Sequence, residues 1–304
     1  MKYLHPQKMA RVTIDSIKTT FKRSILYDYY IIKKTFLEHV GYKCNLINPK
    51  SFNEITNWYK LHDTNPLYPD LIDKAKVKKH IARLIGEQRI IPTIVDNIKS
   101  VDDIPWDDLP DKFVIKCTHD SGSTIICQDK SLLDTEQANA KLKQALLRNP
   151  ADSLTRARVC RKIKPTIMVE ELLPGDDVVD YKMMVFNGVC KMIDVCSQRF
   201  TGAGLRQDNF DITWEHLPFV QRSPISDIPI EKPGQLQEMI ELSEIIAKYV
   251  NRAFVRVDFY DVGSKVFFGE ITFYHAGGYD RFYPNEYDFK LGEMIDLSHG
   301  GKIC

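Results

Sequence analysis

The chain has 304 residues, of which 43% are hydrophobic and 27% are charged, so it is long enough and apolar enough to bury a sizeable core. Its 42 Lys and Arg residues nearly balance its 41 Asp and Glu residues, which leaves no overall basic field for nucleic acid. No apolar leader and no stretch of 18 or more apolar residues is present. We therefore expect a globular cytoplasmic protein, with no nucleic-acid partner.

The cysteines show no CxxC pair and lie mostly in apolar runs, a pattern typical of reduced thiols in a protein core. They are Cys44, Cys117, Cys127, Cys160, Cys190, Cys196 and Cys304. We expect core packing and no zinc site, and we expect no nucleophilic role even for Cys117 beside Lys116.

The first 40 residues carry eight Lys and Arg residues against three Asp and Glu residues. A helix-like run from Ile14 to Val40 mixes these bases with Tyr and Ile. Two interpretations fit: a solvated helix packed on the body of the protein, or a basic face that rests on an anionic membrane or an acidic polymer. The second would hold the protein at the inner face of the membrane by a peripheral contact.

Turn and capping signals predict the elements that follow. Ser51 and Glu54 form the capping-box pattern of a helix start, and a second helix is expected to end near Gly86 before a short strand. Residues 112–130 predict a strand, a loop of small residues and another strand. A helix is expected at 135–147, followed by a strand that runs into a turn.

An Asn-Gly turn between alternating runs in residues 180–200 is typical of a β-hairpin. After a loop-rich stretch to Pro233, the pattern predicts a helix at 236–250 and a second hairpin at 256–273. Strands and helices interleave, but the strand pairs have antiparallel character. The sequence therefore predicts an α+β fold of antiparallel sheets with flanking helices.

The second hairpin, RVDFYDVGSKVFFGEITF, carries Arg256, Asp258 and Glu270 among apolar residues. With a turn centred on residues 262–264, Arg256 would lie opposite Glu270, and Asp258 would be diagonal to Glu270. Two carboxylates on one face suit Mg²⁺, which takes one or two carboxylates together with phosphate oxygens and water. The alternative is an Arg256–Glu270 cross-strand ion pair with Asp258 solvated.

Other segments favour a nucleotide site. Lys116 ends a strand before a loop of small residues, where backbone N–H groups can approach an anion. Glu170 and Glu171 end another strand, and Asp180 and Lys182 share a face by strand alternation. An acid near a sugar hydroxyl and a base near a phosphate fit a nucleotide.

Taken in their order along the chain, these motifs resemble those of the ATP-grasp family. The resemblance is closest to its TupA-like subgroup, which is linked to teichuronopeptide and other surface-polysaccharide biosynthesis. The resemblance spans roughly residues 41–297. It implies an ATP-grasp fold with ATP between two lobes. The expected parts are a basic helical segment (1–50), a helical region (51–110), a small lobe (111–175) and a large lobe with the metal hairpin (176–304).

The resemblance also implies roles for residues that match its motifs. For ATP these are Lys78, Lys116, the loop Ser121, Gly122 and Ser123, the hinge Glu170, Glu171 and Leu172, and the pair Asp180 and Lys182. For two Mg²⁺ ions they are Asp258 and Glu270, and for catalysis they are Arg256, Lys116 and Arg199. Two departures are Thr272, where many relatives have Asn, and a phosphate loop with one glycine and an acid, Asp120.

The implied reaction begins with attack of a substrate carboxylate on the γ-phosphate of ATP, which gives an acylphosphate that an amine converts into an amide. Arg256 would hold the carboxylate as a fork donor. Candidates for substrate contact are Arg206, in a glycine-containing loop, and His275, Gly277 and Arg281, just past the hairpin. Solvated arginines and a structural histidine are the alternative.

Three classes of function remain open on the sequence. The first is a ligase that joins an amino acid or other amine to a carboxylate-bearing saccharide, such as a uronic acid of a capsule, O-antigen or teichuronopeptide precursor. The second is a glycosyltransferase that uses a nucleotide sugar, and the third is a nucleotide-binding partner without turnover. A clear DxD-type pair for the second class is absent.

Overall fold

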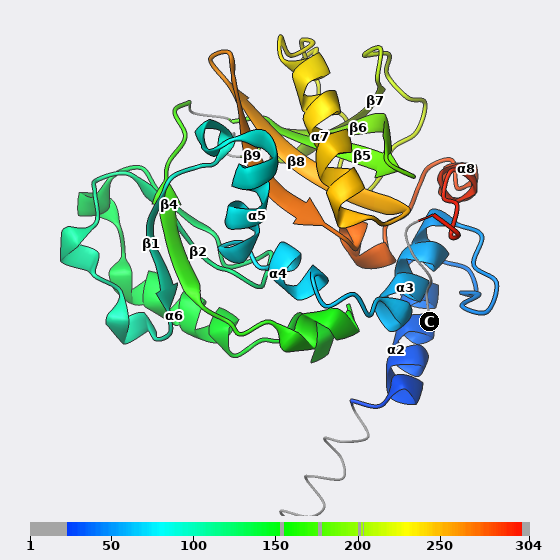
Figure 1. The fold of residues 1–304 in the computed structure, drawn as a ribbon, viewed down its shortest axis with the longest axis horizontal. Helices are drawn as coiled ribbons and strands as arrows, with labels where there is room; N and C mark the ends of the chain where they lie inside the picture. The colour runs from blue at the N-terminus through cyan, green and yellow to red at the C-terminus, as the bar shows by residue number, and fades with distance from the viewer. Residues whose placement is uncertain (1–22, 153–154, 176–177, 200–201, 203, 300–304) are drawn as a thin grey trace, which may run out of the picture.

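The structure, a computed structural model, describes residues 23–152, 155–175, 178–199, 202 and 204–299. Of the helix-like run expected from Ile14 to Val40, the part from Arg23 onward is described and contains a helix at Ile25–His39, and the part before Arg23 lies outside the described residues. Within them the chain forms two antiparallel sheets with helices around them, so the expected α+β class is confirmed (Figure 1).

Three helices pack together beside the larger sheet, where the described chain begins and ends (Figure 1). They are α2 (Ile25–His39), α3 (Phe52–His62) and α8 (Glu286–Glu293). The start of α3 has the expected capping box: Ser51 Oγ accepts from the N–H of Glu54, and the Glu54 carboxylate accepts from the N–H of Ser51. The capping box sets the residue at which α3 begins and thereby the face of α3 that packs on the sheet.

The smaller sheet has four strands in the order β1-β4-β2-β3, and every pair is antiparallel. The strands are β1 (Thr93–Ile98), β2 (Phe113–Cys117), β3 (Ile125–Cys127) and β4 (Ile167–Glu171). Helix α6 (Thr135–Leu146) packs on one face through Leu142 and Ala145, against Phe113 and Ile115. The opposite face of β2 and β4 carries the polar side chains.

The larger sheet has five strands in the order β7-β6-β5-β8-β9, again all antiparallel. The strands are β5 (Asp180–Phe186), β6 (Val189–Ser197), β7 (Arg206–Asp211), β8 (Phe254–Val262) and β9 (Lys265–Thr272). One face packs on α7 (Leu236–Val250). Two shorter segments, α4 (Tyr68–Ile72) and α5 (Lys76–Ile85), connect the sheets, and α5 lies between them (Figure 1).

Short 3-10 turns complete the described elements. They are η1 (Glu87–Arg89), η2 (Val101–Asp103), η3 (Trp106–Asp108), η4 (Lys130–Leu132), η5 (Pro150–Asp152), η6 (Arg158–Lys162) and η7 (His275–Gly278). The expected helices at 135–147 and 236–250 and the Asn-Gly hairpin are confirmed. The short strand expected directly after Gly86 begins later, at Thr93.

Two sequence predictions about strands were wrong. Arg206 begins β7 and does not lie in a loop. In the β8–β9 hairpin the turn is the two-residue Gly263-Ser264, with both φ angles positive. A bulge at Gly269 then places Glu270 directly opposite Asp258, where the sequence had predicted a diagonal pair.

No helix of the described residues is long and apolar enough to cross a membrane. The cysteines at 44, 117, 127, 160, 190 and 196 are free thiols and all are buried, as the sequence predicted. Cys304 lies outside the described residues.

Helix α8 reaches the start of α3 because Gly292 has no side chain. A Cβ at Gly292 would stand 2.0 Å from Lys50 O and 2.8 Å from Phe52 N, and both are backbone atoms that cannot rotate away. We predict that Gly292→Ala destabilises the protein by about 1–3 kcal/mol or more, as overpacked cores do. Urea unfolding compared with Gly234→Ala, at a site with open space around it, measures this. Equal stability of the two variants would contradict it.

Candidate active site

Strand alternation separates the charged side chains of β8 from its core. Val255, Val257 and Phe259 are fully buried against α7, while Arg256 and Asp258 face the other side of the sheet. The hairpin therefore has one apolar face and one charged face.

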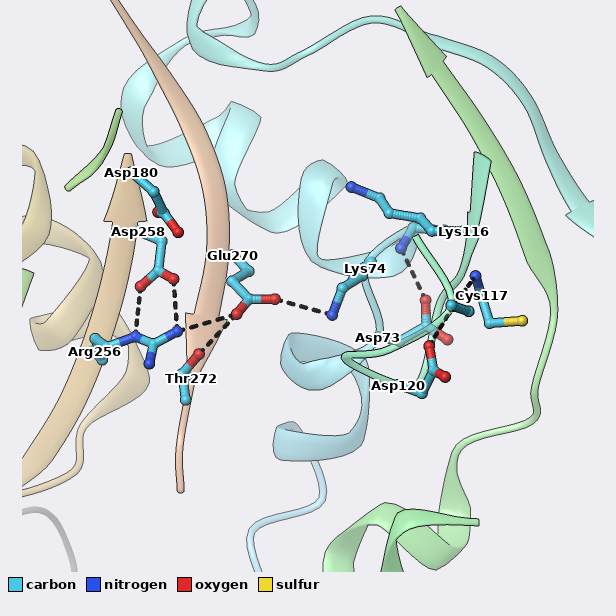
Figure 2. A network of polar contacts seen from close by, with 12 residues as sticks. Asp73, Lys74, Lys116, Cys117, Asp120, Asp180, Arg256, Asp258, Glu270 and Thr272 are labelled. Carbon is cyan, nitrogen blue, oxygen red and sulfur yellow. Dashed lines mark hydrogen bonds and ion pairs between the residues drawn. The ribbon is translucent and has the colours of Figure 1, made fainter. Parts of the chain in front are cut away.

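A buried chain of five ion pairs runs along this charged face, alternating in sign. In order its members are Asp180, Lys182, Asp258, Arg256, Glu270 and Lys74. The set contains three carboxylates and three cations, so its net charge is zero before any ligand binds. Figure 2 shows its central part, with Arg256 between Asp258 and Glu270 and with Lys74 on the far side of Glu270.

Arg256 is the branching point of this chain. Its Nε and Nη2 each lie 2.7 Å from an oxygen of Asp258, which makes a two-point fork, and Nη2 lies 3.2 Å from Glu270 Oε1. Its remaining nitrogen, Nη1, donates to His275 Nδ1 at 3.1 Å. The expected ion pair between Arg256 and Glu270 is present, although the strand partner of Arg256 is Thr272 and not Glu270 as predicted. Asp258 is buried within this ion pair and is not solvated.

Lys74 joins the two sheets, and the sequence analysis missed it. Its Nζ lies 2.9 Å from Glu270 Oε2, and its backbone N–H donates to Thr118 O, just past β2. Burial would raise the pKa of Glu270, but the charges of Lys74 and Arg256 outweigh it and hold that pKa well below its ordinary value. The stretch DKAKVKKH had directed attention to Lys78, four residues further on. The signal that was available is Asp73, which caps the start of α5 and fixes the position of its neighbour Lys74.

The other end of the ion-pair chain holds Asp180 and Lys182, which the sequence had placed on one face. Lys182 pairs with Asp180 and lies 3.3 Å from Asp258. Burial would lower the pKa of Lys182, but Asp180 and Asp258 raise it, so the amine is charged. Arg199, half-exposed, lies 3.5 Å from Asp180 Oδ2.

A second polar group lies on the smaller sheet. Glu170 on β4 forms ion pairs with both Lys116 on β2 and Lys78 on α5, at 2.5 Å for Lys78. These two charges outweigh burial and lower the pKa of Glu170. Lys78 also donates to Ile91 O and Thr93 Oγ1.

The loop after Lys116 is closed by its own side chains. Ser123 Oγ accepts from the N–H of Cys117 at 2.8 Å and donates to Asp120. Ser121 and Gly122 are exposed at the tip, and Gly122 has open space around it. At the hinge, Glu171 is exposed and Leu172 is half-buried.

The residues suggested for substrate contact lie in different places. His275 is buried against Arg256, and burial together with the charge of Arg256 lowers its pKa well below the ordinary value. Gly277 accepts from the buried Lys60 through its carbonyl. Arg281 donates to His39 O at the end of α2, and Arg206 pairs with Asp227.

The oxygen donors present fit Mg²⁺. Asp258 and Glu270 face each other on neighbouring strands, and Asp180 Oδ1 is buried without a hydrogen-bond partner. Hard oxygen ligands supplied by one or two carboxylates, with phosphate oxygens to complete the shell, suit this ion. Thr272 Oγ1 donates to Glu270 Oε1 at 3.1 Å, so here it supports a ligand.

Comparison with known proteins identifies the family. A family model described as TupA-like ATPgrasp matches residues 54–296, and no curated protein sequence matches. The chain belongs to the TupA-like ATP-grasp family. The resemblance inferred from the motifs is therefore confirmed.

Solved structures that match part of this chain include two ligases from Bacillus species. A D-alanine–D-alanine ligase from Bacillus anthracis complexed with ATP is 16% identical, with a TM-score of 0.42 over 74% of this chain and 64% of its own length. An L-amino acid ligase from Bacillus licheniformis is 11% identical, with a TM-score of 0.49 over 90% of this chain and 63% of its own. This TupA-like chain thus spans less than two thirds of either neighbour.

The ion-pair chain predicts a large effect for one substitution. Asp258→Asn leaves Arg256 and Lys182 without their shared counter-ion, so we expect the free energy of unfolding to fall by about 3–5 kcal/mol in the absence of ligand. Urea unfolding gives this value. The matched control is Asp261→Asn, a half-buried acid on the same strand that is outside the ion-pair chain. If the two variants lose equally little stability, Asp258 is not the counter-ion that the geometry indicates.

His275 gives a pH prediction. Because the pKa of His275 is lower in the folded state than in the unfolded state, the unfolded chain binds more protons at low pH. The contribution of His275 to the free energy of unfolding is therefore complete above the unfolded-state pKa of about 6.5 and is lost progressively as the pH falls below it. This contribution makes the free energy of unfolding change by at most about 1.4 kcal/mol per pH unit. In His275→Asn this part of the pH dependence is expected to disappear. Unfolding between pH about 5 and about 7 measures it, with His80→Asn at an exposed site as control. An unchanged slope in His275→Asn would contradict the burial.

Proposed function

We propose that this TupA-like protein is an ATP-dependent carboxylate–amine ligase that forms an amide through an acylphosphate. The observation that carries the proposal is the charged face itself, where Asp258 and Glu270 stand opposite each other with the Arg256 fork beside them. Lys74 links this face to the strand that bears Lys116. Family membership supports the same activity.

ATP would occupy the space between the sheets, with the small lobe at 111–175 and the large lobe at 176–304. Lys116 and Lys78 share one carboxylate, Glu170, and Lys74 shares Glu270 with Arg256. We infer that phosphate oxygens replace these carboxylates as partners of the lysines, because an anion with several charges is the stronger partner. The exposed loop tip at Ser121 and Gly122 and the hinge at Glu171 and Leu172 would close around the nucleotide, and Asp180 would meet its ribose.

Mg²⁺ held by Asp258 and Glu270 would neutralise charge on the phosphates. As Asp258 turns from Arg256 to the metal, Arg256 would bind the substrate carboxylate with the two N–H groups that Asp258 occupies in this structure, which orients one oxygen toward the γ-phosphate. That oxygen forms a bond to the γ-phosphorus as the bond to the bridging oxygen of ADP breaks. The amine then bonds to the carbonyl carbon and releases phosphate, with loss of the amine proton.

His275 has a supporting part in this scheme. Arg256 can only donate, so His275 Nδ1 accepts its hydrogen bond and is kept unprotonated. His275 therefore orients Arg256, and we do not assign it as the base. Arg199, which is half-exposed and reaches Asp180, would contact substrate at the entrance.

For the substrates we propose an amino acid or other amine and a uronic acid or related carboxylate of a surface-polysaccharide precursor. The resemblance to the subgroup linked to teichuronopeptide biosynthesis supports this choice. The basic N-terminal segment, 1–50, would then hold the enzyme near the inner face of the membrane, where such precursors are assembled.

The first test uses hydroxylamine, which converts an acylphosphate into a stable hydroxamate without needing the natural amine. With ATP, Mg²⁺ and a panel of uronic acids, we expect ADP and hydroxamate in equal amounts. A nucleotide sugar that raises the melting temperature where ATP does not would support the glycosyltransferase instead.

A substitution of Lys116 tests its proposed contact with the phosphates of ATP. Lys116→Met removes one phosphate partner but leaves Glu170 paired with Lys78, so the fold is retained while ATP affinity falls on the order of 10–100-fold. Calorimetric titration with ATP measures the change. The control is Lys112→Met, an exposed residue just before β2. Equal affinities in the two folded variants would refute the role of Lys116.

A further inference from the structure

One row of polar side chains crosses the whole larger sheet. Successive cross-strand partners are Asn209, Asp194, Lys182, Asp258 and Glu270, one from each of the five strands. Direct cross-strand partners lie on the same face of a sheet, so all five point to the charged side. The proposed reaction uses the last three, which leaves Asp194 and Asn209 without a task.

These two residues are buried with unsatisfied polar atoms. Asp194 Oδ2 accepts from Gln207 Nε2 at 3.1 Å, but Asp194 Oδ1 has no partner, and neither amide atom of Asn209 has one. The exposed fractions are 1% for Asp194 and 0% for Asn209. Among the described residues no cation forms an ion pair with Asp194, and Lys182, its neighbour in the row, pairs with Asp180 and Asp258. Burial without a paired cation raises the pKa of Asp194 to about 6, although the charges of Lys182 and Arg256 oppose the rise, so a cationic ligand would hold the carboxyl in its charged form.

A line of polar contacts ties this end of the row to the catalytic arginine. Gln207 Nε2 also donates to Gln221 Oε1 at 3.1 Å, and Gln221 Nε2 lies 3.2 Å from His275 Nε2, a proximity of two donors and not a hydrogen bond when His275 Nδ1 accepts from Arg256. His275 in turn accepts from Arg256. Asp194 is two strands from Asp258, roughly 10 Å at the backbone, which is the span of a small substrate.

We propose that Asp194 and Asn209 form the subsite for the ammonium group of the amine substrate, an inference that rests on the proposed ligase activity. An ammonium group donates three hydrogen bonds and brings one positive charge. Asp194 Oδ1 and Asn209 Oδ1 are free acceptors, and Asp194 lacks the charge that an ammonium supplies. A carboxylate or phosphate would be repelled here.

Asp194 can be compared with Asp258, the more buried of the two proposed metal ligands, since Glu270 is half-buried and marks the more open end of the row. Asp194 is 1% exposed and Asp258 is 2% exposed, so both are covered to the same extent. The opening that admits a nucleotide and its metal to Asp258 would also admit the amine to Asp194.

The probe for the test is methylammonium chloride, compared with sodium chloride at equal ionic strength, with ADP and Mg²⁺ present. We expect methylammonium to raise the melting temperature of the wild-type protein and to bind Asp194→Asn at least about tenfold more weakly. The control is Asp208→Asn, the next residue to Asn209 on β7, whose carboxylate accepts from Ser226 on the opposite face. Equal shifts in wild type and Asp194→Asn, or no shift in wild type, would overturn the proposal.

A second measurement needs no variant. Wild-type crystals grown with ADP and Mg²⁺ and soaked in rubidium chloride, whose cation is close to ammonium in size, are expected to show an anomalous peak within contact distance of Asp194 Oδ1. A water molecule there with no anomalous signal would overturn the proposal. Hydroxamate formation is independent of this subsite, so its absence would count against the ligase and not against the subsite.

Discussion

The alternating chain of buried charges is the constraint on which the site depends. Three of its six charged groups are buried and three are half-buried, and they can be so because each carboxylate lies between cations and each cation lies beside carboxylates. The chain also connects the sheets, since Lys74 is fixed to the smaller one and reaches Glu270 on the larger one. A metal ion adds positive charge to a balanced set, so it can enter only as the lysines turn to a new anion. In the proposed site, binding of metal and binding of nucleotide would therefore be linked by electrostatics.

Much of this was predictable from local sequence patterns. The helix caps, the Asn-Gly hairpin and the charged and apolar faces of β8 all follow from residues close together in the chain. The hairpin register was not predictable, because it combines a two-residue turn with a bulge. The predicted hairpin had a wider turn and no bulge. Each of these two differences shifts the pairing by one residue, so together they leave the faces of the side chains unchanged. The prediction therefore placed Asp258 and Glu270 on the same face although the pairing was wrong.

Contacts between distant segments account for what the sequence analysis missed. Lys74 precedes a helix and shows no periodic signal, and its partner Glu270 lies nearly 200 residues away in the sequence. Asn209 and Asp194 become notable only through strand pairing, since β7 begins in a stretch that had been interpreted as a loop. Arg281 illustrates the opposite error: a charge near the hairpin in sequence whose side chain reaches α2.

The bulge at Gly269 has a consequence for how such a site can be gained or lost. From the turn as far as Phe268, the two strands pair in a register that, if continued, would set Glu270 opposite Val257, on the core face. The bulged residue, Gly269, returns Glu270 to the charged face. A side chain at residue 269 would press on Asp258 O and on the ring of Tyr260. Deletion of Gly269 would leave a regular hairpin with the acid still opposite Asp258, whereas regular pairing of residue 269 itself would turn Glu270 toward the core. The chemistry of this face thus depends on whether residue 269 bulges out of the pairing, because a residue that paired regularly there would displace the second acid without replacing it.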